Sequence, residues 1–263
     1  MPPDVDPDGG LVARRPLARF QWPGRELARR AVLDRSGREW PPSTDAQHER
    51  FPYRSSTGLV VGPALPVIRF ASSAAVLNGR IHLVGGWNYN NTNSQSLASH
   101  DAFDLASQQY LPAAGLAPLA QARNAAAHGV IDGKLYIVGG RAPGIRDHDA
   151  QRLAGLEIYT PSTNAWEPGP AMPTARSGAS GAVLNGKLYV LGGELAFPDV
   201  SEAVERYDPT SRQWSTLAPL PFKVHSQGAV VVEGAIYMVG GFRQGGDAIG
   251  SESPHLYRYV PEA

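Results

Sequence analysis

The sequence contains no cysteine among its 263 residues. That absence excludes disulfide bonds, thiolate metal sites and cysteine nucleophiles together. Net charge is also absent, because 24 Lys and Arg residues are matched by 24 Asp and Glu residues. A chain without net charge has no overall field that would attract nucleic acid or an anionic membrane, so we expect neither as a partner.

Long apolar runs and a secretory leader are missing too. No run approaches the length of a membrane span. The first ten residues are acidic and rich in proline and glycine, unlike the basic and then apolar start of a signal peptide. We therefore expect a soluble, cytoplasmic protein. The motifs of the common hydrolases, zinc proteases and phosphate-binding loops do not occur either, so the sequence predicts no cofactor.

Metal ligands are sparse. Asp147, His148 and Asp149 form a compact group of candidate ligands. Three adjacent residues in one loop do not easily converge on a single ion, which favours a solvated loop. The sequence therefore predicts no metal site.

A nine-residue stretch is present four times with small changes. It reads NGRIHLVGG at 78–86, DGKLYIVGG at 132–140, NGKLYVLGG at 185–193 and EGAIYMVGG at 233–241. The first two residues of each copy favour a two-residue β-hairpin turn, since a type I′ turn needs positive φ at both positions. A run of small residues precedes each turn, and a short apolar strand ending in Gly-Gly follows it. Small side chains suit a strand crowded near a central axis.

The second half of each unit carries two aromatic residues with six residues between them. The pairs are Tyr159 with Trp166, Tyr207 with Trp214, and more loosely Phe103 with Tyr110. Each pair predicts two antiparallel strands whose aromatic side chains face one another. Every unit thus contains four strands. The hairpin turns follow one another at intervals of 54, 53 and 48 residues, which is typical of radial arrays.

These marks resemble the kelch repeat, whose signature is the Gly-Gly pair with a downstream Tyr and Trp. The resemblance covers about residues 66–260 and implies an all-β fold, a β-propeller with one four-stranded blade per repeat. The blades are expected at 66–117, 118–172, 173–220 and 221–263. Function stays open, because kelch propellers include protein-docking modules and enzymes alike. The kelch copper oxidases are excluded, because they rely on a modified Cys–Tyr pair.

The ring needs an additional strand to close. The last repeat stops at residues 259–261, where its outermost strand should begin, and an open edge invites pairing with other chains. We predict that Phe20-Gln21-Trp22, within a closing segment at 19–24, supplies that strand. Residues 25–65 would then form a degenerate fifth blade and residues 1–18 a flexible tail, all within one domain, 1–263. The alternative is four blades closed by residues 57–61.

Three arginines form the first group of candidate ligand-binding residues. Arg69, Arg123 and Arg176 each precede a hairpin turn by nine residues, whereas the last repeat has Val224 there with His225 beside it. We expect the arginines near the mouth of the central channel, where guanidinium groups suit a carboxylate or phosphate. The structural alternative is that they bond to carbonyl groups of neighbouring blades or pair with Glu194.

The loops after the Gly-Gly pairs supply the second group. They differ from repeat to repeat while the strands behind them repeat, and such divergent loops usually carry binding specificity. The alternative is an ordinary polar surface. The short, similar turns on the opposite face are expected to contribute little. The candidate residues of this group are Trp87, Tyr89, Arg141, Phe242, Arg243 and His225.

Two hypotheses for function follow. The first is a binding module that takes a protein, a peptide or a small anionic or sugar-like molecule on the Gly-Gly-loop face. The second is a small-molecule isomerase, epimerase, mutarotase, lyase or cyclase with Glu194 or His128 as the base. His128 replaces a small residue on an innermost strand, although a hydrogen-bonded buried imidazole is the alternative, and His82 replaces a core tyrosine. We favour binding, because no acid–base pair is evident.

Overall fold

A computed structural model describes residues 32–33, 39–40, 52–55, 58–88, 95–112, 115–142, 151–246 and 250–261. The chain divides into two units, residues 1–43 and 44–263, where the sequence predicted a single domain. In the first unit, β1 (Val32–Leu33) pairs with β2 (Glu39–Trp40) as an antiparallel hairpin. The described residues form strands and no helix, which confirms the all-β class, and they include no segment fit to cross a bilayer as a helix.

The second unit contains the predicted blades as antiparallel sheets in chain order. The first is built from β5 (Ser73–Leu77), β6 (Arg80–Val84), β9 (His100–Asp104) and β10 (Gln109–Tyr110). The second contains β11 (Ala127–Ile131), β12 (Lys134–Val138), β13 (Leu156–Thr160) and β14 (Ala165–Gly169). The third contains β15 (Ser180–Leu184), β16 (Lys187–Leu191), β17 (Val204–Asp208) and β18 (Gln213–Leu217). The last contains β19 (Gly228–Val232), β20 (Ala235–Val239) and β21 (Leu256–Tyr259).

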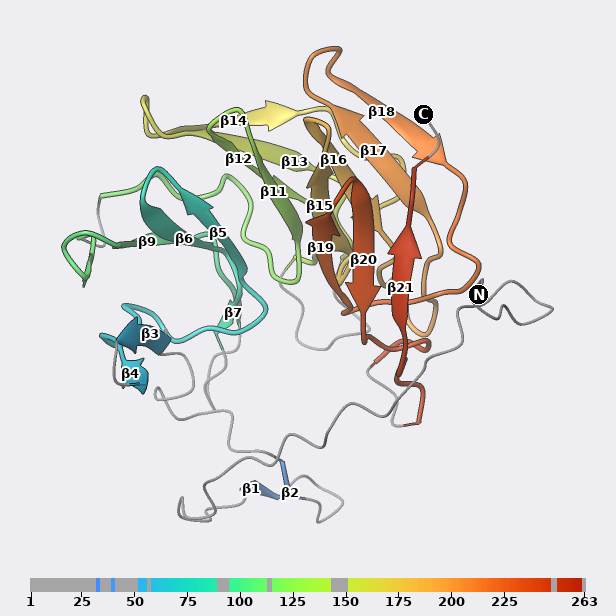
Figure 1. Cartoon of the computed structure of the whole chain (residues 1–263), viewed down its shortest axis with the longest axis horizontal. Helices are drawn as coiled ribbons and strands as arrows, with labels where there is room; N and C mark the ends of the chain where they lie inside the picture. The colour runs from blue at the N-terminus through green and yellow to red at the C-terminus, as the bar shows by residue number, and fades with distance from the viewer. Residues whose placement is uncertain are drawn as a thin grey trace, which may run out of the picture. The chain divides into compact units, whose positions relative to one another are not determined.

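The blades are arranged around their first strands. β5 packs against β11, β11 against β15, and β15 against β19, so each blade contributes its first strand to the axis (Figure 1). Little space separates these strands. A Cβ atom on Gly181 of β15 would lie 2.2 Å from the carbonyl oxygen of His128 on β11, so only glycine fits there. The radial order confirms the β-propeller fold and explains the small residues in the first strands.

Local geometry agrees with the sequence at the turns and at the aromatic pairs. Both residues of each hairpin turn have positive φ, for example 50° at Asn78 and 72° at Gly79, as a type I′ turn requires. The predicted aromatic partners lie opposite one another in the strand register. Their ring centroids are 5.1, 5.2 and 5.3 Å apart in the pairs Tyr159–Trp166, Tyr207–Trp214 and Phe103–Tyr110.

Apolar side chains fill the space between consecutive blades. One cluster joins the first and second blades, a second joins the second and third, and a third joins the third and last. His82 lies at the first of these interfaces, 2% exposed, which confirms it as a core residue. Its Nδ1 is 2.8 Å from Nε2 of His100, and the His100 ring packs edge-on against Tyr159 of the next blade.

The last blade is incomplete in the described part of the chain. It has three strands, as predicted, and β21 pairs with β20 alone among the described strands. Its outer face is apolar and exposed, with Val230 at 57%, Val239 at 55% and Leu256 at 65%.

Of the two predicted ways of closing the ring, one involves residues outside the described part of the chain and the other involves residues within it. The closing strand at Phe20–Trp22 lies outside the described residues, so closure and the degenerate fifth blade stay predictions. The four-blade alternative uses residues 57–61 for closure. Of these, β4 (Gly58–Val61) pairs with β3 (Pro52–Ser55) in a hairpin.

Candidate functional site

Four isolated β-bridges recur at one end of the described blades. In each blade the residue eight positions before the hairpin turn bridges to the residue that follows the Gly-Gly pair. We call the surface that these residues form the bridge face. The four bridges are Phe70–Trp87, Asn124–Arg141, Ser177–Glu194 and His225–Phe242.

The backbone is repeated across the bridge face while the side chains differ. Both N–H···O=C bonds form in every bridge, with N···O distances between 2.6 and 3.2 Å. The second glycine of each Gly-Gly pair fixes this geometry. At Gly140, for example, φ is 89° and a Cβ atom would lie 2.6 Å from the Asn124 carbonyl oxygen. The scaffold is therefore constant, and the chemistry at each bridge is set by two side chains.

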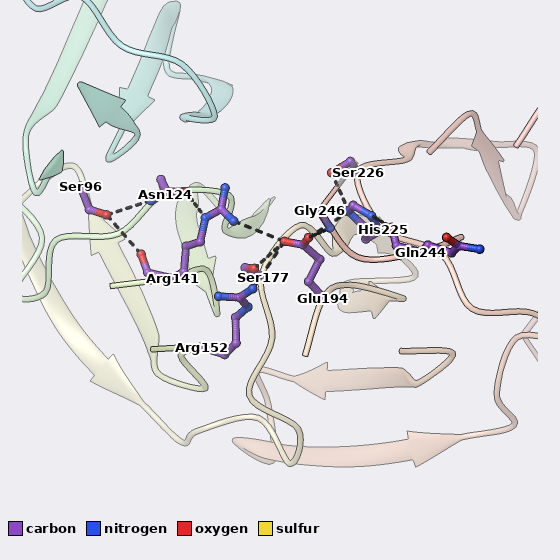
Figure 2. A network of polar contacts seen from close by, with 10 residues as sticks. All are labelled: Ser96, Asn124, Arg141, Arg152, Ser177, Glu194, His225, Ser226, Gln244 and Gly246. Atoms are coloured by element: carbon purple, nitrogen blue, oxygen red, sulfur yellow. Dashed lines mark hydrogen bonds and ion pairs between the residues drawn. The ribbon is translucent and has the colours of Figure 1, made fainter. Parts of the chain in front are cut away.

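Glu194 is the centre of a polar network on this face (Figure 2). Its side chain is only about 10% exposed. Its Oε2 lies 3.4 Å from Nη1 of Arg141 and 3.9 Å from Nη2 of Arg152, both on the second blade. The hydroxyl of Ser177 donates to the same oxygen at 3.3 Å. One carboxylate thus joins two arginines of a neighbouring blade to its own bridge partner.

The network extends into the last blade through the other carboxylate oxygen. Oε1 of Glu194 accepts the backbone N–H of Gly246 at 3.2 Å and lies 3.7 Å from Nδ1 of His225. His225 is fully buried, and its Nε2 lies 2.8 Å from the carbonyl oxygen of Gln244. Because a carbonyl only accepts, Nε2 carries the proton. Glu194 and His225 together hold the loop after Phe242.

Arg141 extends the network toward the first blade. Its Nε donates to Oδ1 of Asn124 at 2.9 Å, and the Asn124 amide donates to Oγ of Ser96 at 2.8 Å. Ser96 belongs to β8 (Gln95–Ser96), the partner of β7 (Trp87–Asn88). Figure 2 shows the resulting chain of contacts running from Ser96 through Glu194 to His225. Four blades are therefore connected by side chains on one face.

A cavity of about 350 Å³ lies among the first strands next to the bridges. Each blade lines it with the two residues that follow the first member of its bridge. Backbone hydrogen bonds join its lining from one blade to the next, because Ala125 donates to Ala71, Gly178 to Ala125 and Ser226 to Gly178 at 2.7–2.8 Å. The lining residues are Ala71, Ser72, Ala125, Ala126, Gly178, Ala179, Ser226 and Gln227.

The three candidate arginines lie beneath the bridge face and not at the mouth of the cavity. Arg69, Arg123 and Arg176 are 3%, 2% and 0% exposed. Each guanidinium donates to the carbonyl of the first glycine in its own Gly-Gly pair, at 3.1, 3.0 and 2.8 Å. Each also forms an ion pair with a carboxylate of the same blade's third strand, namely Asp101, Glu157 and Glu205.

These contacts assign the arginines to the framework. Burial lowers the pKa of Arg123 and Arg176, and the partner carboxylate offsets part of that effect. The expected position at the channel mouth is therefore wrong, because internal carbonyl and carboxylate groups already use the guanidinium donors. The alternative expected internal partners, but the partners are different ones, because the carbonyl groups belong to the arginine's own blade and the carboxylate comes from that blade's third strand in place of Glu194.

The last blade replaces both members of the pair. Val224 takes the place of the arginine, and Tyr257 takes the place of the carboxylate, since Tyr257 pairs with Met238 as Glu205 pairs with Val190. Both residues belong to the apolar cluster between the third and last blades. The exchange of a buried ion pair for an apolar pair keeps the position filled without leaving one charge alone.

The remaining ligand-binding candidates divide into three groups. Trp87, Arg141 and Phe242 are members of the bridge face, and His225 is a member buried beneath Phe242, with ring centroids 5.7 Å apart. Arg243 lies beside the face, with its guanidinium 4.6 Å from the Phe222 ring and a hydrogen bond to the Tyr257 hydroxyl. Tyr89 and the group Asp147, His148 and Asp149 lie outside the described residues.

The two candidate bases are placed on different elements. Glu194 follows β16 and is held by Arg141 and Arg152, whereas His128 lies within β11 and is half-buried. Burial lowers the pKa of His128, while hydrogen bonds to the Ala74 and Ala126 carbonyls act in the opposite direction. No contact among the described residues joins the two side chains. In the described part of the chain, Glu194 and His128 therefore do not form an acid–base pair with each other.

The sequence did not identify three of the eight residues of the bridge face. Phe70, Asn124 and Ser177 each directly follow a repeated arginine, and no motif in the sequence marks them. Phe70 is 51% exposed, while Asn124 and Ser177 are almost fully buried. The signal was available, since these positions diverge between repeats as strongly as the residues after the Gly-Gly pairs.

Comparison with known proteins agrees with this architecture. The family described as "KLHDC2/KLHL20/DRC7 Kelch-repeats domain" matches residues 54–241. The solved structure titled "Structure of YjhT" is similar with a TM-score of 0.62 and 19% identity, covering 70% of this chain and 62% of that one. At that identity the likeness concerns the fold alone.

Similar sequences occur in longer proteins. Kelch-like protein 33 of Homo sapiens is 37% identical over 50% of this chain and 23% of its own length. The putative F-box/kelch-repeat protein At2g29800 of Arabidopsis thaliana is 30% identical over 55% and 34%. Kelch-like ECH-associated protein 1B of Danio rerio is 34% identical over 43% and 18%. The matched region spans no more than about a third of these relatives.

Proposed function

The chain belongs to the kelch-repeat family, and on that premise we propose that it is a binding module whose bridge face takes a segment of a protein partner. One observation carries the proposal. The same backbone bridge recurs in four blades with four different pairs of side chains. A constant scaffold beneath divergent side chains is how repeat proteins present a specific surface.

The chemistry of the face suits a peptide. Apolar surface is present at Phe70 and Trp87 of the first blade, and Phe197 is 55% exposed on the loop after Glu194. Between them lies the polar network of Asn124, Arg141 and Glu194, and its internal bonds fix the positions of these groups. Aromatic anchors around preorganised polar groups are the usual composition of a binding hot spot.

The enzyme hypothesis has weaker support. Its candidate bases, Glu194 and His128, do not meet, and its candidate substrate clamp, the three arginines, is engaged inside the blades. A small anionic or sugar-like ligand would depend on the same three arginines, and their guanidinium groups are already bound to internal partners. These observations favour a protein or peptide partner over a small substrate.

A peptide-display selection on the whole chain tests the proposal. Peptides enriched on the wild-type protein are expected to bind a Trp87→Ala variant more weakly by about 1–3 kcal/mol, because a central aromatic anchor typically contributes that much. The melting temperature should change little, since the bridge of residue 87 is made by backbone atoms. Binding is measured by calorimetry and stability by thermal denaturation.

Arg212→Ala is the matched control. Arg212 is exposed on the turn between β17 and β18, away from the bridges, so this variant should bind the selected peptides normally. Peptides that bind Trp87→Ala as well as wild type but lose affinity for Arg212→Ala would place the binding surface elsewhere and refute the proposal.

A further inference from the structure

A second cavity lies at the opposite end of the blades from the bridges, between the third and last blades. Its volume is about 300 Å³. The third blade contributes Leu184, Asn185, Lys187, Tyr189 and Arg206, and the last blade contributes Gly234 and Pro261. Asn185 and Gly234 belong to hairpin turns, so the cavity is on the face from which the sequence predicted little binding capacity.

Arg206 is the unusual member of this lining. It lies on β17, opposite Tyr189 of β16, and is half-buried. Its Nε is fully buried without a hydrogen-bond partner. No ion pair of Arg206 occurs within the described ranges either. A buried guanidinium donor that bonds to nothing is unfavourable, so this site is incomplete without an acceptor.

Comparison with the sister blades shows that the fold does not require a cation there. The first and second blades have Ala102 and Ile158 at the same register position, and both are buried apolar residues. The last blade has Arg258, which is exposed on the outer face. Arg206 is therefore a charged exception at an interface position that the two preceding blades fill with hydrocarbon.

Among the described residues, no neighbouring carboxylate compensates the positive charge of Arg206. Lys187 also lines the cavity, but it forms an ion pair with Asp208, and that bond lowers the pKa of Asp208. Asp208 accepts two backbone N–H groups as well, from Thr210 and Ser211. The nearby carboxylate is thus engaged by Lys187 and the turn, while Tyr189 adds a phenol to the lining.

We propose that this cavity is an oxyanion site, in which Arg206 binds a phosphate or carboxylate group, with Lys187 and Tyr189 at its edge. A guanidinium matches such a group because two parallel N–H donors meet two oxygens. The site is separate from the bridge face and does not depend on the function proposed for that face.

Inorganic phosphate is the probe for the test. The melting temperature of the full chain is followed over a series of phosphate concentrations at constant ionic strength, with chloride as the replacing anion so that general screening is the same. We expect a rise of about 2–4 °C when phosphate is in tenfold excess over its dissociation constant. A second titration with acetate shows whether the cavity also binds carboxylates.

Arg206→Ile is the decisive variant, because it copies the residue of the second blade and should fold. It is expected to lose the phosphate response, with binding weakened by about tenfold or more. Arg212→Ala, an exposed arginine already paired with Glu167, should respond like wild type. An equal phosphate response in Arg206→Ile, or no response of wild type to either anion, would overturn the proposal.

The chain's own Glu262 follows directly on Pro261 and is the rival occupant. Glu262→Gln separates the two cases. A phosphate response that is the same in this variant and in wild type supports an external ligand. A response that appears only in Glu262→Gln would show that the chain fills the cavity itself, and the proposal of a ligand site would fall.

Discussion

Adjacent residues of the same loop behave in opposite ways in this molecule. Arg176 is repeated in three blades, is completely buried and forms an ion pair with Glu205. Ser177, the next residue, differs in every blade and belongs to the bridge face. The repeated position therefore belongs to the framework, and the divergent position next to it belongs to the bridges at which the blades differ.

The contrast also shows how an arginine should be interpreted in a repeat protein. A cation that recurs at one register position is more simply explained by a recurring internal partner than by an external ligand. Here the partners recur as well, at Asp101, Glu157 and Glu205. A ligand that meets several blades at once would instead require different groups from each blade.

The largest effect is expected from breaking the buried layer. Arg176→Ala leaves the carboxylate of Glu205 buried without its partner, and removal of one member of such a pair costs about 3–5 kcal/mol. Urea denaturation measures the loss. Ser177→Ala, one residue away, should cost only about 1 kcal/mol, because it removes a single hydrogen bond to Glu194.

The last blade supplies the matched control for that prediction. The double variant Arg176→Val with Glu205→Tyr copies Val224 and Tyr257, so it removes both charges together. It should be clearly more stable than Arg176→Val alone. If Arg176→Val and the double variant lose the same free energy of unfolding, the ion pair between Arg176 and Glu205 is not what stabilises this position. The contrast drawn between Arg176 and Ser177 would then be wrong.

An intermediate effect is expected from acid. Burial, with a smaller effect of His82, lowers the pKa of His100 from 6.5 to about 4. Above pH 6.5 the imidazole is neutral in both states. As the pH falls from 6.5 toward 4, the unfolded chain takes up a proton that the folded chain refuses, so stability falls by about 3 kcal/mol. The pKa of His82 is lowered too and acts in the same direction.

The second blade again provides the control. Its residues at the two positions are Tyr136 and Leu156, so His82→Tyr with His100→Leu copies them. Unfolding free energies at pH 7.5 and pH 4.5 should differ by about 3 kcal/mol less in this variant than in wild type. A variant that retains the full loss at pH 4.5 would show that other groups govern acid sensitivity.

The smallest effect is expected on the bridge face. Glu194→Gln keeps an acceptor for Gly246 and Ser177 but removes the charge that faces Arg141 and Arg152. Because glutamine keeps these hydrogen bonds and the two arginines lie at long distances of 3.4 and 3.9 Å, we expect a loss of about 1–2 kcal/mol in denaturation experiments. Glu202→Gln, at an exposed position, should change nothing. A loss as large as that of Arg176→Ala would place Glu194 in the framework.

Much of the fold could be predicted because it depends on signals within one repeat. The Asn185–Gly186 turn and the Tyr159–Trp166 pair need only neighbouring strands, and both were found where expected. The role of the arginines could not be read in this way. Arg123 and Glu157 are 34 residues apart, and only the joint change to Val224 and Tyr257 in the last repeat links the two positions.

The site was harder to predict for a related reason. Divergence identifies Trp87 and Arg141 as surface positions, but it does not show which groups on different blades meet. The junction of Arg141, Glu194 and His225 joins residues from three blades, and no spacing in the chain encodes it. Contacts between different blades depend on how the blades are arranged around their axis, and the sequence of one repeat does not contain that information.

The exposed face of the last blade gives the series of blades two unlike ends. At one end Val76 on the first blade is 62% exposed, and at the other Val230 and Leu256 are exposed beside the single-sided strand β21. Two unlike ends join copies head to tail, and such joints form a closed ring or an open filament, depending on whether the rotation between copies closes. We therefore expect a shortened chain that begins at Pro66 to associate with further copies through these two ends.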